Sequence, residues 1–291
     1  MTQRLRVSDA VVESLQQTNR IDRCFAALRA RGEAALVPFL TLGDPSVEMT
    51  LELMHAVEQE GADLIELGVP FSDPTADGPV LQRSLEIGLQ AGGTLPRALE
   101  VVQQFRRHSD VPVVLYGYYN PIFRYGVEAF ARDAASAGVD GLLVVDLPPE
   151  EAEELLQWTR PAGLHFVCLL APTSGPDRVE VVLRHAAGFI YYVSVTGVTG
   201  VKVIRPAEVR PAVLALRERT HLPIGVGFGI STAEHAAAVA EFADAVVVGS
   251  ALMRLVDLHR EQEDMVPQVA SLVRRLKHAI LEVRRTPGHS V

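Results

Sequence analysis

Two carboxylates in one short stretch are the residues best suited to acid–base chemistry. Glu66 lies in the apolar run 63–69, and Asp77 follows in the segment 68–79 (GVPFSDPTADGP). Burial of Glu66 would raise its pKa and suit it to exchanging a proton near neutral pH. The run alone leaves open whether Glu66 instead faces an outer helix and pairs with an arginine. Asp77 alone would be taken for a solvated turn residue, so the argument for chemistry depends on both carboxylates lying at the same strand end.

Three glycine-containing segments later in the chain could bind a phosphate. They are 194–200 (SVTGVTG), 225–231 (GVGFGIS) and 246–252 (VVVGSAL), and each ends or follows an apolar run. Glycines let backbone N–H groups approach an anion, and a following helix N-terminus adds favourable polarity. Any one of these glycine pairs is more often a simple turn. Three of them at one end of a sheet favour phosphate binding.

Several other kinds of chemistry lack suitable residues. The two lysines, Lys202 and Lys277, both fall outside the apolar runs, which disfavours a Schiff-base aldolase. The nine histidines do not gather after these runs, so no metal site is expected. Acid–base catalysis by carboxylates on a phosphorylated substrate is what remains.

Composition limits the partners and the location. The net charge is −9 and no basic run offsets it, so nucleic acid is not an expected partner. The N-terminus is charged throughout, unlike a signal peptide, and no apolar run is long enough to span a bilayer, so no membrane association is expected. The two cysteines, Cys24 and Cys168, form no disulfide framework, which predicts a cytoplasmic protein.

The elements that must position the carboxylates alternate along the chain. Nearly continuous apolar runs indicate parallel strands covered on both faces, and amphipathic segments between them indicate helices. Eight such strands in 291 residues favour a closed barrel over a doubly wound sheet. The first turn, TLGDPS, also lacks a dinucleotide fingerprint. The expected strands are 35–42, 63–69, 111–117, 141–145, 165–171, 189–195, 223–227 and 245–249.

The predicted fold is therefore a (β/α)8 TIM barrel with an extra N-terminal helix over its bottom. We expect an N-terminal extension (1–18), a single barrel domain (19–285) and a C-terminal tail (286–291). The active site of such a barrel lies at the C-terminal ends of the strands. Ser46 and Ser231, with Thr232 as the alternative to the latter, are expected helix N-caps. The expected helices are 47–60, 95–107, 127–137, 150–159, 177–186, 208–220, 233–241 and 266–284.

Seven segments, in order from Asn19 to the C-terminal helix, resemble the tryptophan synthase alpha subunit family. They are NRIDRCFAALRARG, PFLTLGDPS, ADLIELGVPFSDPTADGP, YYNPIFRYGVEAF, SVTGVTG, VGFGIST and VVVGSAL. The resemblance implies a lyase of tryptophan biosynthesis that cleaves indole-3-glycerol phosphate to indole and glyceraldehyde 3-phosphate by a retro-aldol reaction. It also implies an α2β2 complex in which pyridoxal phosphate belongs to the beta subunit, so this chain would carry no cofactor.

The resemblance also implies roles for individual residues. Glu66 would protonate the indole C3 and take the side-chain hydroxyl proton, while Asp77 would receive the indole N–H. Thr199 would close near Asp77 when the loop after strand six covers the substrate. Phe39 and Tyr191 would line the indole pocket. The phosphate contacts would be Gly200, Gly229, Gly249 and Ser250, with Phe228 nearby.

Some points stay open at the level of sequence. Residues 70–73, Asn120 and Pro121 are candidate contacts with a beta subunit, or simple turns. After VTG the chain reads VKVIRPAEV, which is more apolar than the family's charged stretch. The alternatives are a freestanding indole-3-glycerol phosphate lyase, a non-catalytic subunit that only activates the beta chain, and another phosphate-binding barrel such as a sugar-phosphate isomerase. Loss of either carboxylate would mark the non-catalytic subunit, and both are present.

Overall fold

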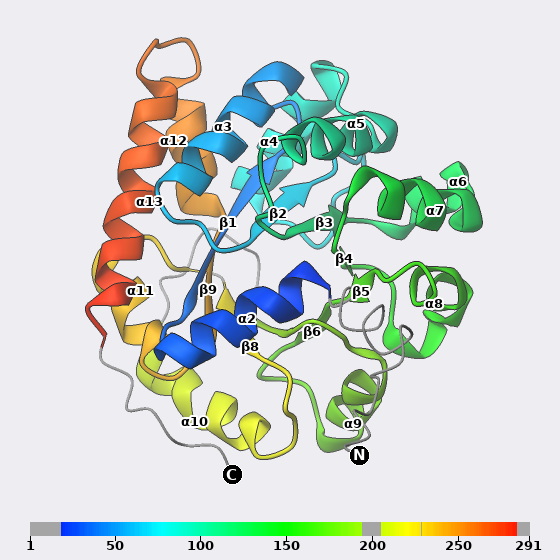
Figure 1. The fold of residues 1–291 in the computed structure, drawn as a ribbon, viewed down its shortest axis with the longest axis vertical. Helices are drawn as coiled ribbons and strands as arrows, with labels where there is room; N and C mark the ends of the chain where they lie inside the picture. The colour runs from blue at the N-terminus through cyan, green and yellow to red at the C-terminus, as the bar shows by residue number, and fades with distance from the viewer. Residues whose placement is uncertain (1–18, 194–204, 228, 284–291) are drawn as a thin grey trace, which may run out of the picture.

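The computed structural model describes residues 19–193, 205–227 and 229–283 of the chain, and Figure 1 shows a parallel sheet enclosed by helices. The expected boundaries of the extension (1–18) and the tail (286–291) fall outside these residues. Strand pairing is parallel throughout, in the order β5-β4-β3-β2-β1-β9-β8-β7-β6. The strands are β1 (Ala35–Thr41), β2 (Ile65–Gly68), β3 (Val113–Gly117), β4 (Gly141–Val144), β5 (His165–Phe166), β6 (Cys168–Leu170), β7 (Ile190–Val193), β8 (Ile224–Gly227) and β9 (Ala245–Val248).

The expected TIM barrel is confirmed, with one difference in the fifth strand. The run 165–171 forms two short strands, β5 and β6, on either side of Val167. The first half pairs with β4 and the second with β7, and the Val167 N–H donates to the carbonyl of Leu142 at 2.8 Å. The ring of strands therefore closes through this one divided strand.

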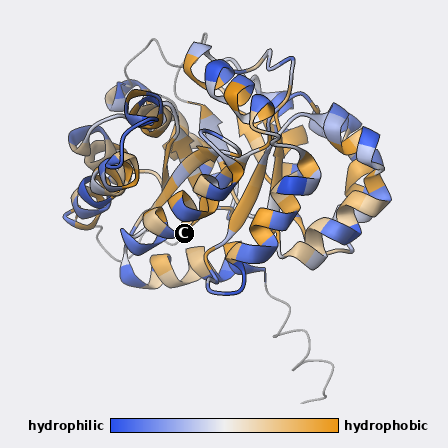
Figure 2. Cartoon of the chain, turned by 90° about the horizontal axis from the view of Figure 1, so that it is seen from above, coloured by the Kyte–Doolittle hydropathy of each residue, from blue (hydrophilic) through white to orange (hydrophobic). Residues whose placement is uncertain are grey.

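Helices cover the outside of the barrel, and their apolar sides face the strands (Figure 2). Ser46 caps α3 by accepting the Met49 N–H, as expected, whereas α11 is capped by Thr232 in place of Ser231. Two helices, α4 and α6, were not predicted, whereas α12 is the helix expected to follow the last strand. The helices are α2 (Arg20–Arg31), α3 (Val47–Gln59), α4 (Pro79–Gln90), α5 (Leu95–Phe105), α6 (Tyr119–Tyr125), α7 (Val127–Ala137), α8 (Glu153–Thr159), α9 (Pro176–His185), α10 (Pro206–Arg217), α11 (Ala233–Ala240), α12 (Ser250–His259) and α13 (Met265–Leu281), with a 3-10 turn η1 (Pro149–Glu151) before α8.

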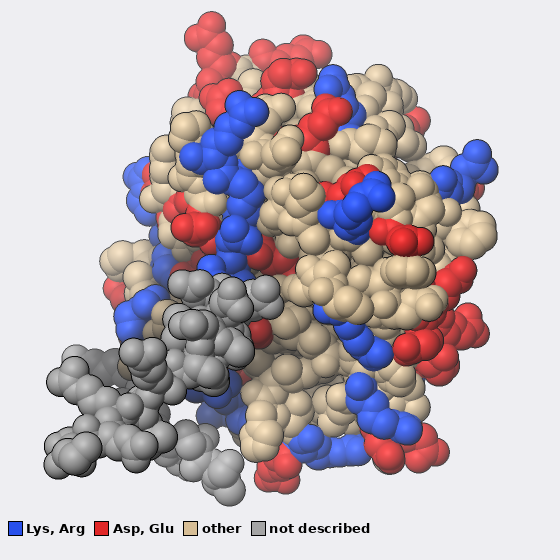
Figure 3. Space-filling model, turned by 45° about the vertical axis from the view of Figure 1, so that its right-hand side comes forward, with Lys and Arg blue, Asp and Glu red and all other residues tan. Residues whose placement is uncertain are grey.

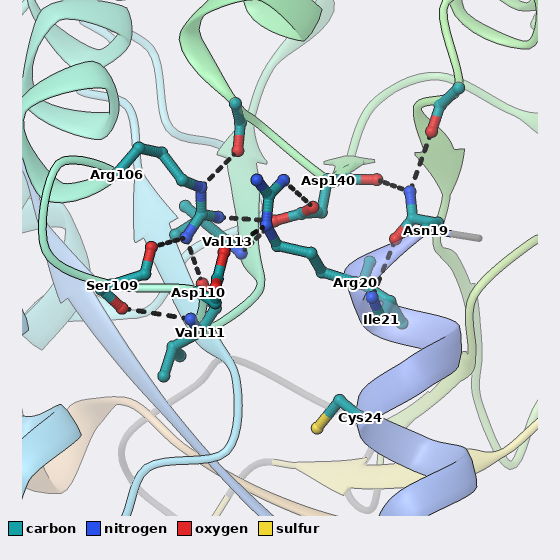
Figure 4. Close-up of polar contacts among 12 residues, drawn as sticks. Asn19, Arg20, Ile21, Cys24, Arg106, Ser109, Asp110, Val111, Val113 and Asp140 are labelled. Atoms are coloured by element: carbon teal, nitrogen blue, oxygen red, sulfur yellow. Dashed lines mark hydrogen bonds and ion pairs between the residues drawn. The ribbon is translucent and has the colours of Figure 1, made fainter. Parts of the chain in front are cut away.

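Helix α2 is the expected N-terminal helix, and it lies across the end of the barrel where the strands begin (Figure 1). Its buried Phe25 packs against Phe189 with ring centroids 5.7 Å apart. Asn19 caps the helix and donates to the carbonyl of Asp140, while Arg20 pairs with the Asp140 carboxylate at 3.1 Å (Figure 4). The apolar contact and the polar contacts together fix α2 to the entry of β4.

The surface carries charges of both signs. Figure 3 shows basic and acidic side chains close together on the face it presents. Within the described residues, no helix is both long enough and apolar enough to cross a membrane.

Candidate active site

Glu66 lies in β2 and faces the interior of the barrel. It stands in register with Phe39 of β1 and Val114 of β3, so strands on both sides fix its backbone. Tyr191 lies on β7, far from β2 in the strand order. Burial raises the pKa of its phenol most, and the charge of Glu66 raises it further. A side chain on β2 can lie close to β7 only if it points into the barrel. The alternative of an outward Glu66 paired with an arginine is therefore wrong.

One oxygen of the Glu66 carboxyl group is buried without a hydrogen-bond partner in the described part of the chain. The side chain is 1% exposed, and Oε1 has no hydrogen-bond partner among the described residues. Burial raises its pKa to about 8, because the charged form loses its hydration and no cation among the described residues compensates. At neutral pH the group is predominantly a carboxylic acid and can donate a proton.

Asp77 is also buried, at 2% exposure, although it belongs to a loop. Its carboxylate accepts one phenol on each oxygen: Tyr116 Oη lies 2.8 Å from Oδ1, and Tyr118 Oη lies 2.6 Å from Oδ2. Burial raises the pKa of Asp77, and the two phenols, which stabilise the charged form, work against that shift. A solvated turn residue would have neither feature. Sequence reasoning missed both tyrosines; the signal was the recurrence of tyrosine in LYGYYNP at the end of an apolar run.

Two aromatic rings occupy space that glycines leave free. A Cβ on Gly68 would lie 2.5 Å from Cζ of Phe39, and a Cβ on Gly227 would lie 2.1 Å from Oη of Tyr191. Neither position therefore tolerates a side chain while the rings keep their places. The Phe39 ring also meets the ring of Tyr116 edge-on, with centroids 5.2 Å apart. The predicted pocket residues Phe39 and Tyr191 are thus buried at the same barrel interior as Glu66.

The candidate phosphate site is described only in part. Gly249 precedes α12 and Ser250 is its first residue, and this helix has no side-chain cap at its N-terminus. The N–H groups of Leu252 and Met253 donate to the Gly249 carbonyl, which leaves those of Ser250 and Ala251 for an anion. Gly249 also borders Phe39, because a Cβ there would lie 3.4 Å from the Phe39 Cβ. Gly229 has a positive φ of 76°. Thr199, Gly200 and Phe228 lie outside the described residues.

A buried aspartate ties together the elements that carry these groups. Asp44 follows β1, and its Oδ2 lies 2.7 Å from Oγ of Ser84 on α4. Its Oδ1 accepts a hydrogen bond from Arg260, directly after α12, at 3.1 Å. Helix α4 begins two residues after Asp77, and α12 begins at the candidate phosphate site. The contact therefore fixes the two halves of the site relative to each other.

The whole arrangement can bind a substrate that has an aromatic ring and a phosphate. Residues from β1, β2, β3, β7 and the end of β9 converge on one end of the barrel. The lysine that the structure describes, Lys277, is elsewhere: it pairs with Asp63 at 2.7 Å, at the end where the strands begin. The groups at hand are a neutral carboxylic acid, a buried carboxylate, aromatic walls and a helix N-terminus.

Comparison with known proteins shows which family the chain resembles. Residues 25–281 match the sequence model of the family described as tryptophan synthase alpha chain. The chain is 51% identical over 267 residues to the tryptophan synthase alpha chain of Geobacter sp. (strain M21), covering 92% of this chain and 100% of that one. It is 54% identical over 240 residues to that of Laribacter hongkongensis (strain HLHK9), covering 82% and 91% respectively.

Solved structures show the same similarity in three dimensions. The tryptophan synthase subunit alpha of Legionella pneumophila str. Paris superimposes with a TM-score of 0.86 at 40% identity, covering 91% of this chain and 100% of that one. A chain from the tryptophan synthase complex of Pyrococcus furiosus gives a TM-score of 0.75 at 37% identity, covering 84% and 98%. Both sequence and fold therefore point to one family.

Proposed function

Because the chain belongs to the tryptophan synthase alpha chain family, we propose that Glu66 and Asp77 carry out its reaction, the cleavage of indole-3-glycerol phosphate. The chain is accordingly a carbon–carbon lyase of tryptophan biosynthesis. The observation that carries the assignment of residues is the buried carboxyl group of Glu66, which has one oxygen without a hydrogen-bond partner among the described residues and a pKa raised to about 8. A carboxylic acid that stays protonated at pH 7 is a proton donor ready for use.

The proposed reaction moves one proton in and one proton out through Glu66. Glu66 first protonates C3 of the indole ring, which becomes a positively charged indolenine. Asp77 accepts the ring N–H and stabilises that charge. The carboxylate left on Glu66 then takes the proton of the adjacent side-chain hydroxyl while the bond between C3 and the side chain breaks. The bond electrons return to the ring, indole and glyceraldehyde 3-phosphate form, and Glu66 is again protonated.

Binding of the substrate would use the surrounding groups. Phe39 and Tyr191 would hold the indole ring, and the N-terminus of α12 at Gly249 and Ser250 would receive the phosphate, with Gly229 beside it. Thr199, Gly200 and Phe228 are proposed to complete the site on the basis of family resemblance alone. The burial of both aromatic rings supports a pocket that excludes water from the indole.

A beta subunit is the proposed partner. Solved relatives include a tryptophan synthase complex, from Pyrococcus furiosus. Residues 70–73, Asn120 and Pro121 are the proposed contacts, and Phe123 on the same helix α6 is 57% exposed, a large apolar side chain on the surface. In an α2β2 complex of this kind, pyridoxal phosphate would belong to the beta subunit. We place the reaction in the cytoplasm, since the structure leaves Cys24 and Cys168 as free thiols.

The test measures indole release from indole-3-glycerol phosphate by the wild type and by Glu66→Gln, with and without a tryptophan synthase beta subunit. We expect slow release by the wild type alone, acceleration by the beta subunit, and no release by Glu66→Gln. The variant should still bind glycerol phosphate with nearly unchanged affinity. Near-normal turnover by Glu66→Gln would remove this residue from the mechanism. Fast release indifferent to the beta subunit would favour a freestanding lyase, and no release by the wild type would favour a non-catalytic subunit.

A further inference from the structure

The contacts of Asp77 identify a further residue of the reaction. We propose that Tyr116 is a positioning residue: its phenol fixes the Asp77 carboxylate to the barrel so that the carboxylate meets the indole N–H in one orientation. This inference rests on the proposed role of Asp77.

Asp77 needs an external anchor because its own backbone lies in a loop. Its N–H donates to the carbonyl of Pro74 within that loop at 3.1 Å, and its carbonyl accepts from Gln82 of the following helix at 2.9 Å. These contacts hold the main chain but do not direct the carboxylate. Among the described residues, the donors to its two oxygens are the phenols of Tyr116 and Tyr118.

The two phenols hold Asp77 to different parts of the molecule. Tyr118 follows β3 directly and is the N-cap of α6, while its side chain packs on the loop: its Oη also accepts the Ala76 N–H at 3.1 Å and its ring contacts Phe71 at 5.0 Å. Tyr116 is instead a residue of β3 itself. It stands in register with Gly68 of β2 and Leu143 of β4, so its backbone is held from both sides.

The ring of Tyr116 is fixed as well as its backbone. Its edge-on contact with Phe39 has an interplanar angle of 85°. Phe39 cannot turn freely, since it fills the space left by the missing side chain of Gly68. The phenol oxygen therefore occupies a position set by three strands, and Asp77 is aligned to that position.

The same hydrogen bonds leave Asp77 chemically able to act. A carboxylate has about four acceptor positions, and the two phenols use two of them, which leaves room for the indole N–H. Each phenol also stabilises the charged form and lowers the pKa of Asp77 against the effect of burial. Loss of the Tyr116 hydroxyl should thus both loosen the carboxylate and raise its pKa.

The experiment compares Tyr116→Phe, Tyr118→Phe and Asp77→Asn in the chain without a beta subunit. Phenylalanine keeps the ring contact with Phe39 and removes only the hydroxyl. Tyr125→Phe is the matched control, because that phenol donates to Asp133 at 2.9 Å on the outer helices. Values of kcat and KM for indole-3-glycerol phosphate are measured from pH 4 to 10. The phosphate of the substrate titrates identically in every variant, so differences between variants report on the protein.

For Tyr116→Phe we expect kcat to fall roughly 10- to 100-fold with KM changed less than about threefold, since a hydrogen bond to a charged group is lost. The acid limb of kcat/KM should move upward by about one pH unit. Tyr125→Phe should match the wild type. If Asp77→Asn is inactive while Tyr116→Phe keeps a normal kcat and an unchanged acid limb of kcat/KM, the proposed role of Tyr116 is overturned and that of Asp77 is not. A loss in Tyr125→Phe equal to that in Tyr116→Phe would also overturn it. Full turnover by Asp77→Asn would instead overturn the proposed role of Asp77.

Discussion

Both ends of the barrel bury carboxylates, but the two proposed for catalysis, Glu66 and Asp77, are surrounded differently from those where the strands begin. Where the strands begin, an aspartate lies directly before a strand or one residue earlier. It makes two hydrogen bonds with one residue of the neighbouring strand: its N–H donates to the carbonyl of that residue, and its carboxylate accepts the N–H. Asp140 shows the pattern: its N–H donates to the carbonyl of Val113 at 2.9 Å, and its Oδ2 accepts the Val113 N–H at 2.8 Å. Asp63 does the same with Leu36, and Asp244 with Ile224. The sequence repeats accordingly as GAD, GVD and FAD before three strands.

Each of these aspartates also pairs with a cation from an outer helix. Arg106 meets Asp140 at 2.6 Å, with further bonds to backbone carbonyls (Figure 4), and the corresponding partners of Asp63 and Asp244 are Lys277 and Arg217. Such carboxylates have their acceptor capacity used and their charge balanced. They join strand to strand and strand to helix, which is a structural role.

Where the strands end, Asp44 still pairs with Arg260, but Glu66 and Asp77 have no cation partner among the described residues. Glu66 has an oxygen without any partner, and Asp77 receives only phenols. Burial of an unpaired carboxyl group costs stability, and in return the group keeps its capacity to exchange a proton or bind a substrate N–H. The comparison indicates that the surroundings of a buried carboxylate, and not burial alone, distinguish the two carboxylates proposed for catalysis from the structural ones.

The comparison is tested most strongly by removing the charge of a carboxylate proposed for catalysis. Asp77→Asn should lower kcat by roughly 100- to 1000-fold, because a neutral amide cannot balance the charge of the indolenine. Rates of indole release with saturating substrate provide the measurement, and Asp133→Asn on an outer helix is the control that should change nothing. A kcat within about threefold of the wild type would place Asp77 with the structural carboxylates.

Removing the charge of a structural carboxylate should have the reverse effect. Asp140→Asn should lower the free energy of unfolding by about 3 kcal/mol, since Arg106 is left buried without its partner, while kcat stays unchanged. Urea unfolding followed by circular dichroism measures this. Asp110→Asn is the matched control. The Asp110 side chain is 92% exposed and pairs with Arg20, as Asp140 also does, so the free energy of unfolding should fall by less than about 0.5 kcal/mol. An Asp140→Asn that is stable but inactive would erase the distinction between the two kinds of carboxylate.

A third test concerns the stability that the buried Glu66 costs as its carboxyl group ionises. The folded-state pKa of Glu66 is raised to about 8, so its contribution to stability is fully present below the unfolded pKa of 4.5 and is lost as pH rises towards 8. Relative to Glu66→Gln, the wild type should therefore lose about 1.4 kcal/mol per pH unit across this window. Urea unfolding of both proteins at several pH values gives the difference. A constant difference from pH 5 to 8 would mean that Glu66 is not held neutral.

The sequence predicted the barrel well because strands buried on both faces appear as nearly continuous apolar runs. It also predicted Glu66 and Asp77 as a pair, since both lie at the same strand end. The direction of Glu66 could not be predicted, because a single carboxylate in an apolar run fits either face of the strand. The burial of Asp77 was also beyond prediction, because it depends on Tyr116 and Tyr118 from another part of the chain.

Other differences have equally local causes. The fifth strand is divided at Val167 because its first half pairs with β4 and its second half with β7. No residue type in the run marks this division. Glycine in 225–231 was read as room for an anion, yet Gly227 makes room for Tyr191. Composition alone does not distinguish a glycine that admits a ligand from one that admits a side chain.

The most direct test of the account is the pH dependence of kcat/KM for indole-3-glycerol phosphate cleavage by the wild-type chain from pH 5 to 10. If Glu66 donates the proton as a buried neutral acid, kcat/KM should fall tenfold per pH unit above about 8. A value that stays constant to pH 10 would contradict the central claim that burial without a partner makes Glu66 the proton donor.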